Sequence, residues 1–494
     1  MSCLKIPLGK VFRMPGHKED ELVITFPLSP EPAEFAHPDG TIRSTNKSSV
    51  VDIFDLVKTG PKVIDNAIVD GMFILRNLVV PLPHTLRGLV RHVLMKIMKM
   101  AVHRVDFLLD TYNSPCLKDI ARDIRGDDLD DGDEVYAFGS GQKTPSNFLT
   151  LLKYSNFKRE FLRFFFEEIR KDEYAHIIGS KVLYCSVDNE CVRLHCDQDG
   201  TLIVEEIHEL YGAHEEADTR VAFHTGHIDQ LNPGNTIIRC NDTDILIIML
   251  ANIEKFSQTH LWLDMGLDYN NSRTHIDVNQ SAENIDFLKA LPGVYAYTGC
   301  DYVPAFFRKG KKRPVEIMLK STKYIDTFNK LGQEELTVED ADVLESFTCT
   351  MFGYDKLSSI NEARYHYFKS KCKPKEVAKP LEFLKHVDPS MFPPCQSVLL
   401  EQIKRAWLIA RLYKNASAAD PLENCSLLDF GYELVDNLVQ IKWFDGDQVP
   451  AEAEDHVDAA LELSDEEGSD EDDEVTDEED SEESEDENSD DDRD

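Results

Sequence analysis

The stretch that decides the fold class runs from residue 236 to residue 248 and reads Thr-Ile-Ile-Arg-Cys-Asn-Asp-Thr-Asp-Ile-Leu-Ile-Ile. Its first five residues are mostly apolar or β-branched, which predicts a buried strand over residues 236–240. An apolar run after Asp244 predicts a helix, so Asp242 and Asp244 fall in the turn between strand and helix. Ligands of open α/β sheets bind at the carboxyl ends of the strands, and this turn therefore places two acids where a ligand is expected.

Other acids follow short apolar runs in the same way. Asp70 comes after Asn-Ala-Ile-Val, Asp110 comes after Val-Asp-Phe-Leu-Leu, and Asp301 lies within Thr-Gly-Cys-Asp-Tyr. Glu216 and Asp218 are two residues apart, and only a helix N-terminus or a turn aims both side chains at one point. An unpaired carboxylate at the end of a buried strand is costly. We therefore expect folding to bring these acids together around positive charge. Divalent metal ions are the simplest source of that charge.

Residues 63–320 alternate short β-rich runs with helical patterns, which predicts an α/β fold with a mostly parallel sheet. The strand candidates are residues 67–70, 105–109, 236–240 and 261–263. Between residues 182 and 206, two apolar runs flank Asp-Asn and Asp-Gly pairs and predict an antiparallel hairpin. Apolar residues at helical spacing predict one long packed helix over residues 156–176.

Composition divides the whole chain into four parts. Residues 1–60 are rich in Pro, Ser and Asp and predict a loosely structured lead-in that packs on the α/β domain at residues 61–320. Residues 321–450 look mainly helical, with the clearest helix over residues 401–415, after a break at Pro393-Pro394. Residues 451–494 bury too little apolar surface to offset the entropy of ordering, which predicts a disordered acidic tail.

Charge and cysteine content narrow the class of protein. The 494-residue chain has a formal net charge of −39, but residues 451–494 contribute 26 of its 92 acidic residues and one of its 53 basic residues. The rest is only mildly acidic, which argues against coating of long nucleic acid through net charge and leaves room for a local basic strip. Eleven scattered cysteines without a CxxC pair indicate reduced thiols. No stretch approaches about eighteen consecutive apolar residues, so we expect a soluble nuclear or cytoplasmic protein with no membrane partner.

The acids, taken in chain order with their flanking residues, resemble those of the flap endonuclease and XPG-like 5′ nucleases of the PIN-like superfamily. The segments ending at Asp70 and Asp110 are similar to the first two strands of that family and their metal-binding acids. Glu216-Ala-Asp218 is similar to the family's Glu-Ala-Glu pair, and Asp242-Thr-Asp244 to its Asp-x-Asp step. Thr-Gly-Cys-Asp301-Tyr resembles its Gly-Ser-Asp-Tyr segment. The resemblance covers roughly residues 63–320 and extends to uncharacterised, often transposon-like animal proteins.

The resemblance implies a two-metal phosphodiesterase with a PIN-like, mostly parallel sheet flanked by helices. It implies two Mg²⁺ or Mn²⁺ ions that activate water and stabilise the leaving oxygen of a DNA or RNA phosphodiester. Carboxylates packed together without cations would repel one another and raise their pKa values, so cations are also favoured physically. The residues to which the resemblance assigns both catalytic and metal-binding roles are Asp70, Asp110, Glu216, Asp218, Asp242, Asp244 and Asp301.

A basic run follows Asp301 and occupies the place of the Gly-Ile-Gly-Pro-Lys hairpin with which the family grips duplex phosphates. Gly310 and Lys312 fall in register with its second Gly and its Lys, although Arg308 replaces the first Gly. The residues of this run expected to contact nucleic acid are Arg308, Lys309, Gly310, Lys311, Lys312 and Arg313. After Asp110, three more basic residues are expected to place positive charge over the scissile phosphate, namely Lys118, Arg122 and Arg125.

Other interpretations stay open. Asp242 and Asp244 taken alone are typical of helix caps, and residues 308–313 also fit a nuclear import signal or an exposed basic loop. His224 and His227 fit ordinary packed histidines better than a metal site. A catalytically silent PIN-like module that binds nucleic acid or protein would show the same pattern of acids. The acidic tail is also a candidate for recruiting basic partner proteins.

Overall fold

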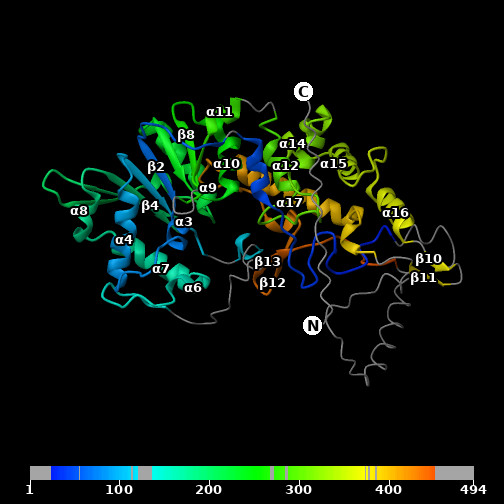
Figure 1. Ribbon diagram of the computed structural model, residues 1–494, viewed down its shortest axis with the longest axis horizontal. Helices are drawn as coiled ribbons and strands as arrows, with labels where there is room; N and C mark the ends of the chain where they lie inside the picture. The colour runs from blue at the N-terminus through cyan, green and yellow to red at the C-terminus, as the bar shows by residue number, and fades with distance from the viewer. Residues whose placement is uncertain are drawn as a thin grey trace, which may run out of the picture.

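The computed structural model describes residues 24–450, except for residues 55, 113–114, 121–135, 268–271, 284–286, 373, 377–378 and 384–386. The predicted tail at residues 451–494 lies outside the described residues, as do Arg122 and Arg125. Figure 1 shows a sheet in one half of the molecule and a group of helices in the other. Helices α9 (Ala217–Leu231) and α10 (Thr243–Asn252) lie between the two halves.

The sheet has nine strands in the order β1-β9-β8-β7-β2-β3-β4-β5-β6. Its centre, β4-β3-β2-β7-β8, is parallel, whereas both edges are antiparallel. The strands are β1 (Leu56–Val57), β2 (Asn66–Asp70), β3 (Arg104–Leu108), β4 (Val182–Val187), β5 (Glu190–Cys196), β6 (Leu202–Glu206), β7 (Asn235–Arg239), β8 (His260–Met265) and β9 (Thr274–Asp277). The predicted α/β class with a mostly parallel sheet is therefore confirmed.

The four strands predicted from the sequence all lie in the parallel centre, as β2, β3, β7 and β8. The predicted hairpin is larger than expected, because β4, β5 and β6 form a three-stranded antiparallel unit whose first strand also pairs in parallel with β3. The Asp188-Asn189 and Asp199-Gly200 pairs stand at its two turns, and Asp188 and Gly200 adopt the positive φ angles that such tight turns require.

Helices cover both faces of the sheet. Side chains alternate along β2, so that Ile68 joins one buried cluster whereas Ala67 and Val69 join the other. Helices α4 (Leu86–Met98) and α7 (Ser155–Glu168) contribute to the second cluster, and α9 and α10 contribute to the first. Shorter helices complete these layers, namely α3 (Gly71–Arg76), α6 (Phe148–Leu151), η2 (Asp172–Tyr174), α8 (Ala175–Ile178), η3 (His208–Leu210), η4 (Ile253–Lys255) and α11 (Val278–Glu283).

The predicted helix over residues 156–176 is wrong in its second half. Helix α7 ends at Glu168, and a short 3-10 helix and α8 follow it. The Glu168 carboxylate accepts hydrogen bonds from Ser140 Oγ and Tyr174 OH, and the Asp172 carboxylate accepts one from the backbone of Leu202. These tertiary contacts turn the chain where the apolar periodicity alone would continue the helix.

The chain after the sheet is rich in helices. They are α12 (Leu291–Tyr297), α13 (Lys312–Met318), α14 (Thr322–Lys330), α15 (Val338–Met351), α16 (Ile360–Lys371), η6 (Pro389–Met391), α17 (Gln396–Lys414) and η7 (Leu427–Asp429). The predicted helix over residues 401–415 corresponds to α17, which begins five residues earlier, after the Pro393-Pro394 break, and ends at Lys414, one residue short of the predicted end. Two hairpins also occur, β10 (Pro374–Glu376) with β11 (Lys379–Phe383) and β12 (Tyr432–Val435) with β13 (Leu438–Ile441). Residues 321–450 are therefore less uniformly helical than the sequence predicts.

One buried cluster joins these helices to the sheet. It contains Ile238 of β7, Val294 of α12 and Leu408 of α17, and also Phe35 and Val50 from the segment before the sheet. A 3-10 helix in that segment, η1 (Lys47–Ile53), packs beside α10. Residues 24–54 thus pack on the body, as the sequence predicts for the lead-in.

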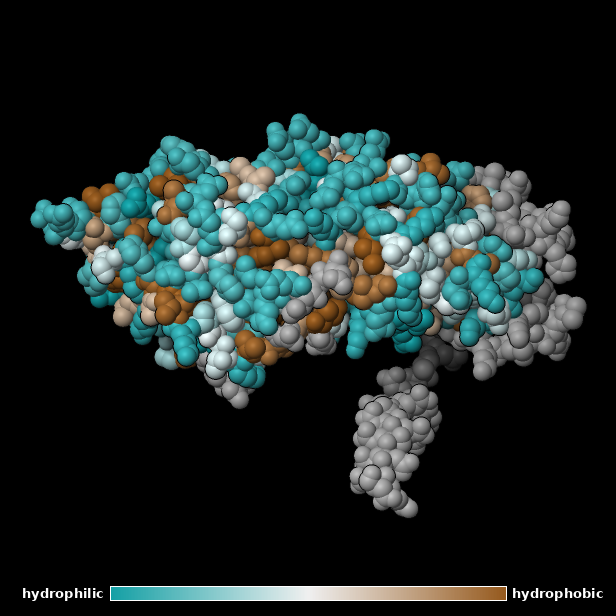
Figure 2. Space-filling view, turned by 90° about the horizontal axis from the view of Figure 1, so that it is seen from above, coloured by the Kyte–Doolittle hydropathy of each residue, from teal (hydrophilic) through white to brown (hydrophobic). Residues whose placement is uncertain are grey.

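Figure 2 shows a mostly hydrophilic face, with hydrophobic residues gathered near its middle. Within the described ranges, none of the helices combines the length and the apolar character needed to cross a bilayer.

Candidate functional site

The order of the parallel strands places a binding edge between β2 and β7. From β2 the chain moves to β3 and β4 on one side, and it then returns to β7 and β8 on the other side. Such a reversal opens a crevice at the carboxyl ends of the strands. Asp70 ends β2, Asp110 follows β3 and Asp242 follows β7, so three of the predicted acids lie along this edge.

Two of these acids cap helices that begin at the edge. The Asp70 carboxylate accepts hydrogen bonds from the backbone N–H groups of Met72 and Phe73, at 2.9 and 3.1 Å, and the Asp242 carboxylate accepts one from the backbone of Asp244 at 2.9 Å. A Cβ atom at Gly71 would clash with Leu109 Cδ2 and lie 2.7 Å from the carbonyl oxygen of Leu108. Glycine therefore lets α3 start directly against β3, and this contact fixes where Asp70 points.

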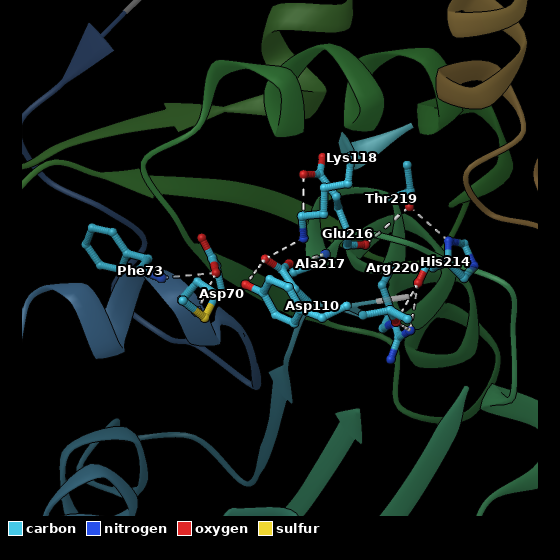
Figure 3. Close-up of polar contacts among 12 residues, drawn as sticks. Asp70, Phe73, Asp110, Lys118, His214, Glu216, Ala217, Thr219 and Arg220 are labelled. Carbon is cyan, nitrogen blue, oxygen red and sulfur yellow. Dashed lines mark hydrogen bonds and ion pairs between the residues drawn. The ribbon is translucent and has the colours of Figure 1, made fainter. Parts of the chain in front are cut away.

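Asp110 connects β3 to the start of α9. Its Oδ1 atom accepts a hydrogen bond from the backbone of Ala217 at 2.9 Å. Glu216 is the N-cap residue of α9 and Asp218 lies in its first turn, so the sequence prediction of an acidic helix N-terminus is correct. Figure 3 shows Asp70, Asp110 and Glu216 as neighbours at this junction.

Lys118 neutralises part of this group. Its ammonium lies 2.8 Å from Asp110 Oδ2 and 3.7 Å from Glu216 Oε1, as the dashed lines of Figure 3 show. Although burial opposes ionisation, the charge of Lys118 lowers the pKa of Asp110. Tyr302 OH donates a hydrogen bond to Glu216 Oε2. Lys118 thus lies among the predicted acids, where its charge is shared by two carboxylates. Its predicted contact with nucleic acid stays a prediction.

A second lysine, Lys47 of η1, neutralises two further acids. Its ammonium lies 2.5 Å from Asp301 Oδ1 and 3.3 Å from Asp244 Oδ2. The buried Asp244 carboxylate also accepts hydrogen bonds from Tyr295 OH at 2.5 Å and from Tyr413 OH at 2.7 Å. Both oxygens of Asp244 are therefore bound to protein donors, and the predicted role of Asp244 as a direct metal ligand does not match this geometry.

Three of the acids, Asp70, Asp218 and Asp242, form no ion pair within the described residues, although the charges of Arg76 and Lys47 act on the pKa values of Asp70 and Asp242. Burial and the nearby Asp110 raise the pKa of Asp70 to about 7, and burial and Asp244 raise the pKa of Asp242 to about 7. Burial, Asp242, Glu216 and Asp70 raise the pKa of Asp218 well above its ordinary value. Burial raises the pKa of the Cys240 thiol, directly after β7, and the charges of Asp70, Asp218 and Asp242 raise it further. These three carboxylates therefore lie close enough to repel one another.

The donor set has the chemistry that a hard divalent cation prefers, since it consists of carboxylate oxygens. Within the described ranges, however, no three His, Cys, Asp or Glu side chains are already arranged around one point as metal ligands. The fit is therefore one of donor type and charge, and the side chains would have to close around an ion.

A cavity of about 270 Å³ opens beside the carboxylates. Glu216, Asp218 and Asp244 line it, together with Tyr302 and Tyr413. Its remaining wall includes Leu117 and several residues between positions 412 and 427. The chain after residue 400 thus forms one side of the candidate site.

The basic run at residues 308–313 divides into buried and exposed side chains. Lys311 is buried, and its ammonium donates hydrogen bonds to the carbonyl oxygens of Tyr295 and Gly299 and to Thr298 Oγ1. It therefore anchors the end of α12, and its predicted role as a phosphate contact is wrong. Arg308, Gly310, Lys312 and Arg313 are exposed, whereas Lys309 is half-buried over the ring of Phe352.

The histidines are packed, as the sequence favours. His224 is fully buried, with Nδ1 2.7 Å from Asp106 Oδ2 and Nε2 2.9 Å from Ser186 Oγ. His227 Nδ1 lies 2.9 Å from Arg104. Because Asp106, His224 and Ser186 are all fully buried, this series of hydrogen bonds holds α9 on the sheet and has no access to a substrate.

Sequence reasoning missed four residues of the site, namely Lys47, Tyr295, Tyr302 and Tyr413. Tyr302 directly follows Asp301, so the Gly-Cys-Asp-Tyr segment contained a signal for it. Lys47 and Tyr413 lie some 200 and 170 residues from Asp244, and no local pattern marks them. Comparisons with models of known protein families and with curated proteins gave no match for this chain.

Proposed function

We propose that this protein is a metal-dependent phosphodiesterase that acts on nucleic acid. The observation that supports this proposal most is the group Asp70, Asp218 and Asp242. These carboxylates come from three different elements at the reversal point of a parallel sheet, form no ion pair within the described residues and have raised pKa values. Repulsion among them disfavours the ionised state without a cation, so the arrangement is suited to binding one.

Mg²⁺ or Mn²⁺ would be held by Asp70, Asp218 and Asp242, with Asp110, Glu216 and Asp301 around them. Such an ion lowers the pKa of bound water and stabilises charge on a phosphoryl oxygen. The protein's own residues would orient the reactants. Asp70 and Asp242 are fixed by backbone hydrogen bonds, and Lys118 keeps Asp110 ionised.

Exposed basic residues near Asp301 would bind the nucleic acid. Arg308, Lys312 and Arg313 are available for contacts to a phosphate backbone, which position a nucleic acid without reading its sequence. Lys118, beside Asp110, would place positive charge near the scissile phosphate. DNA and RNA both carry the phosphodiester that this arrangement suits.

Asp218→Asn tests the proposal, because Asp218 has no hydrogen bond or ion pair in the part of the chain that the structure describes. We expect purified protein to cleave single-stranded, flap or bubble substrates of DNA or RNA with added Mg²⁺, and Asp218→Asn to lower the rate at least a hundredfold. Asp342→Asn is the matched control, since Asp342 is an exposed carboxylate on α15. Cleavage that persists in Asp218→Asn or in excess chelator would refute the proposal.

A catalytically silent module that binds nucleic acid or protein is the second candidate. The ion pairs of Lys118 and Lys47 favour it, because they neutralise four of the seven acids without any metal. Metal-independent binding of DNA or RNA without cleavage under any ionic condition would support it. Basic proteins are further candidate partners through the acidic residues 451–494, and deletion of that segment would test this role separately.

A further inference from the structure

Lys47 enters the candidate site from a segment that precedes the sheet in the chain. It is the first residue of η1. Val50 of η1 and Phe54, which follows this helix, are buried in the same cluster as α10. A few residues earlier, Arg43 donates hydrogen bonds to the carbonyl oxygen of Ala33 and to Ser390 Oγ, both at 2.8 Å. The backbone carbonyl of Arg43 also accepts a hydrogen bond from the N–H of Ala305. The segment that carries Lys47 is therefore well packed, and this packing holds the ammonium in the candidate site.

The acids that Lys47 contacts have little capacity left for a metal ion. One ammonium bridges Asp244 and Asp301, and it is only 2.5 Å from Asp301 Oδ1. Two tyrosine hydroxyls occupy the same two oxygens of Asp244. A divalent ion placed here would have to displace Lys47 and break hydrogen bonds from the tyrosines.

The neighbouring acids Asp70, Asp218 and Asp242 form no ion pair in the part of the chain that the structure describes. Asp218 has no ion pair or hydrogen bond within the described ranges, and Asp70 and Asp242 each accept only backbone hydrogen bonds, on one oxygen. Among the described residues, direct ion pairs are therefore made to Asp110, Glu216, Asp244 and Asp301, whereas Lys47 reaches Asp242 only through its charge.

We propose that the ammonium of Lys47 takes the place of a second cation, so that the centre holds one divalent ion, at Asp70, Asp218 and Asp242, instead of two. This inference rests on the proposed function for the existence of the metal centre. It replaces the two-ion arrangement that the family resemblance implies. Lys47 acts as a fixed structural cation that keeps Asp244 and Asp301 in position.

The number of bound ions tests the inference directly. Calorimetric titration of full-length protein with Mn²⁺, supported by electron paramagnetic resonance of bound Mn²⁺, is expected to give one ion per chain. Lys47→Met removes the ammonium and keeps the length of the side chain. We expect it to bind two ions and to bind the first about tenfold more tightly, because a nearby positive charge has been removed.

Lys47→Arg and Lys356→Met are the matched controls. Arginine keeps the charge, so Lys47→Arg should bind one ion. Lys356 is an exposed lysine with no role in the candidate site, so Lys356→Met should also bind one ion. Melting curves identify unfolded variants, and Lys47→Gln replaces Lys47→Met if the latter fails to fold. Two ions on the unmodified protein would overturn the inference and leave the proposed function intact. One ion on both the unmodified protein and Lys47→Met would also overturn it, and no bound ion on the unmodified protein would overturn both proposals.

Discussion

The proposed metal-binding role of Asp218 lowers the stability of the metal-free protein, because the carboxylate is repelled by other acids. This carboxylate lies near Asp242, Glu216 and Asp70, all of which raise its pKa. We predict that Asp218→Asn stabilises the metal-free protein at pH 8 by about 1–2 kcal/mol, because it removes repulsion between partly buried charges. Urea unfolding with and without Mg²⁺ measures this, and the stabilisation by Mg²⁺ should be lost in the variant.

For Asp244→Asn, the matched comparison, we predict the opposite change in stability. Asp244 accepts hydrogen bonds from Tyr295 and Tyr413 and pairs with Lys47, so its neutralisation should destabilise the protein by about 2–4 kcal/mol. If both substitutions destabilise the metal-free protein equally, the division of the acids into neutralised and unneutralised groups is wrong.

The raised pKa values of Asp70 and Asp242, about 7 each, predict a specific pH dependence. In the unfolded chain both groups ionise near pH 4, so the folded state holds extra protons between pH 4 and pH 7. That contribution to stability is present at low pH and is lost as the pH rises through 7. We expect the metal-free protein to lose about 0.5–1 kcal/mol for each group between pH 6.5 and pH 8, after allowance for partial exposure.

Titration of the packed histidines does not add to the change in stability expected between pH 6.5 and pH 8. Burial lowers the pKa values of His214, His224 and His227, the last to about 4, so all three destabilise the fold only as the pH falls below about 6.5. Denaturant unfolding at half-unit pH intervals measures the effect. Saturating Mg²⁺ should flatten the curve above pH 6.5, and a curve that is already flat without metal would contradict the prediction.

At the residue scale, sequence reasoning works where the chemistry is local. Acids that directly follow strands or start helices, such as Asp70, Glu216 and Asp242, can be located from the alternation of apolar runs and turns. Lys47 cannot, because only tertiary packing brings η1 beside α10. Lys311 also looks like its exposed neighbours in the sequence, and only the carbonyl groups at the end of α12 distinguish it.

At the element scale, the start of α13 separates a structural lysine from binding residues. We predict that Lys311→Met costs about 2–4 kcal/mol of stability, because the oxygens of Tyr295 and Gly299 lose their donor. Its affinity for nucleic acid should not change. Joint replacement of Arg308, Lys312 and Arg313 by Gln should do the reverse, and should reduce the slope of log affinity against log salt by about 2–3. Fluorescence anisotropy across a salt series measures the slopes, and weaker binding by folded Lys311→Met would contradict this assignment.

Strands that lie in the buried centre of the sheet were easier to predict than a helix end that depends on contacts with distant residues. The strands β2, β3, β7 and β8 were predictable from their short apolar runs, because buried parallel strands are rich in Val, Ile and Leu. Strand β3 was predictable even though it also contains the buried Arg104 and Asp106. Helix α7 was predictable at its start, but its end depends on contacts of Glu168 and Asp172 with distant residues. The sequence contains no helix-stop signal at that point that is stronger than the apolar periodicity.

At the scale of the whole molecule, the division at residue 320 that composition suggests does not coincide with a gap in the buried core. Val294, Leu344 and Leu408 share one hydrophobic cluster with Ile238 of the sheet. Gln402 of α17 donates hydrogen bonds to the carbonyl oxygens of Tyr297 and Pro304, at 3.0 and 2.7 Å. Composition cannot show this, because a helix that packs on its own neighbours and one that packs on the sheet have the same periodicity.

This shared core predicts that residues 61–320 do not fold alone. Such a fragment lacks Tyr413, which donates to Asp244, and Lys47, which pairs with it, and it would expose the apolar surface of α10 that α17 covers in the intact chain. Loss of several buried aliphatic side chains at about 1.5–3 kcal/mol each exceeds the stability of an ordinary domain. Circular dichroism and urea unfolding of the fragment should show no cooperative transition, whereas the full-length chain should show one. If the fragment unfolds cooperatively and still binds Mn²⁺, residues 321–450 are an accessory region and the wall they form beside Asp218 is dispensable.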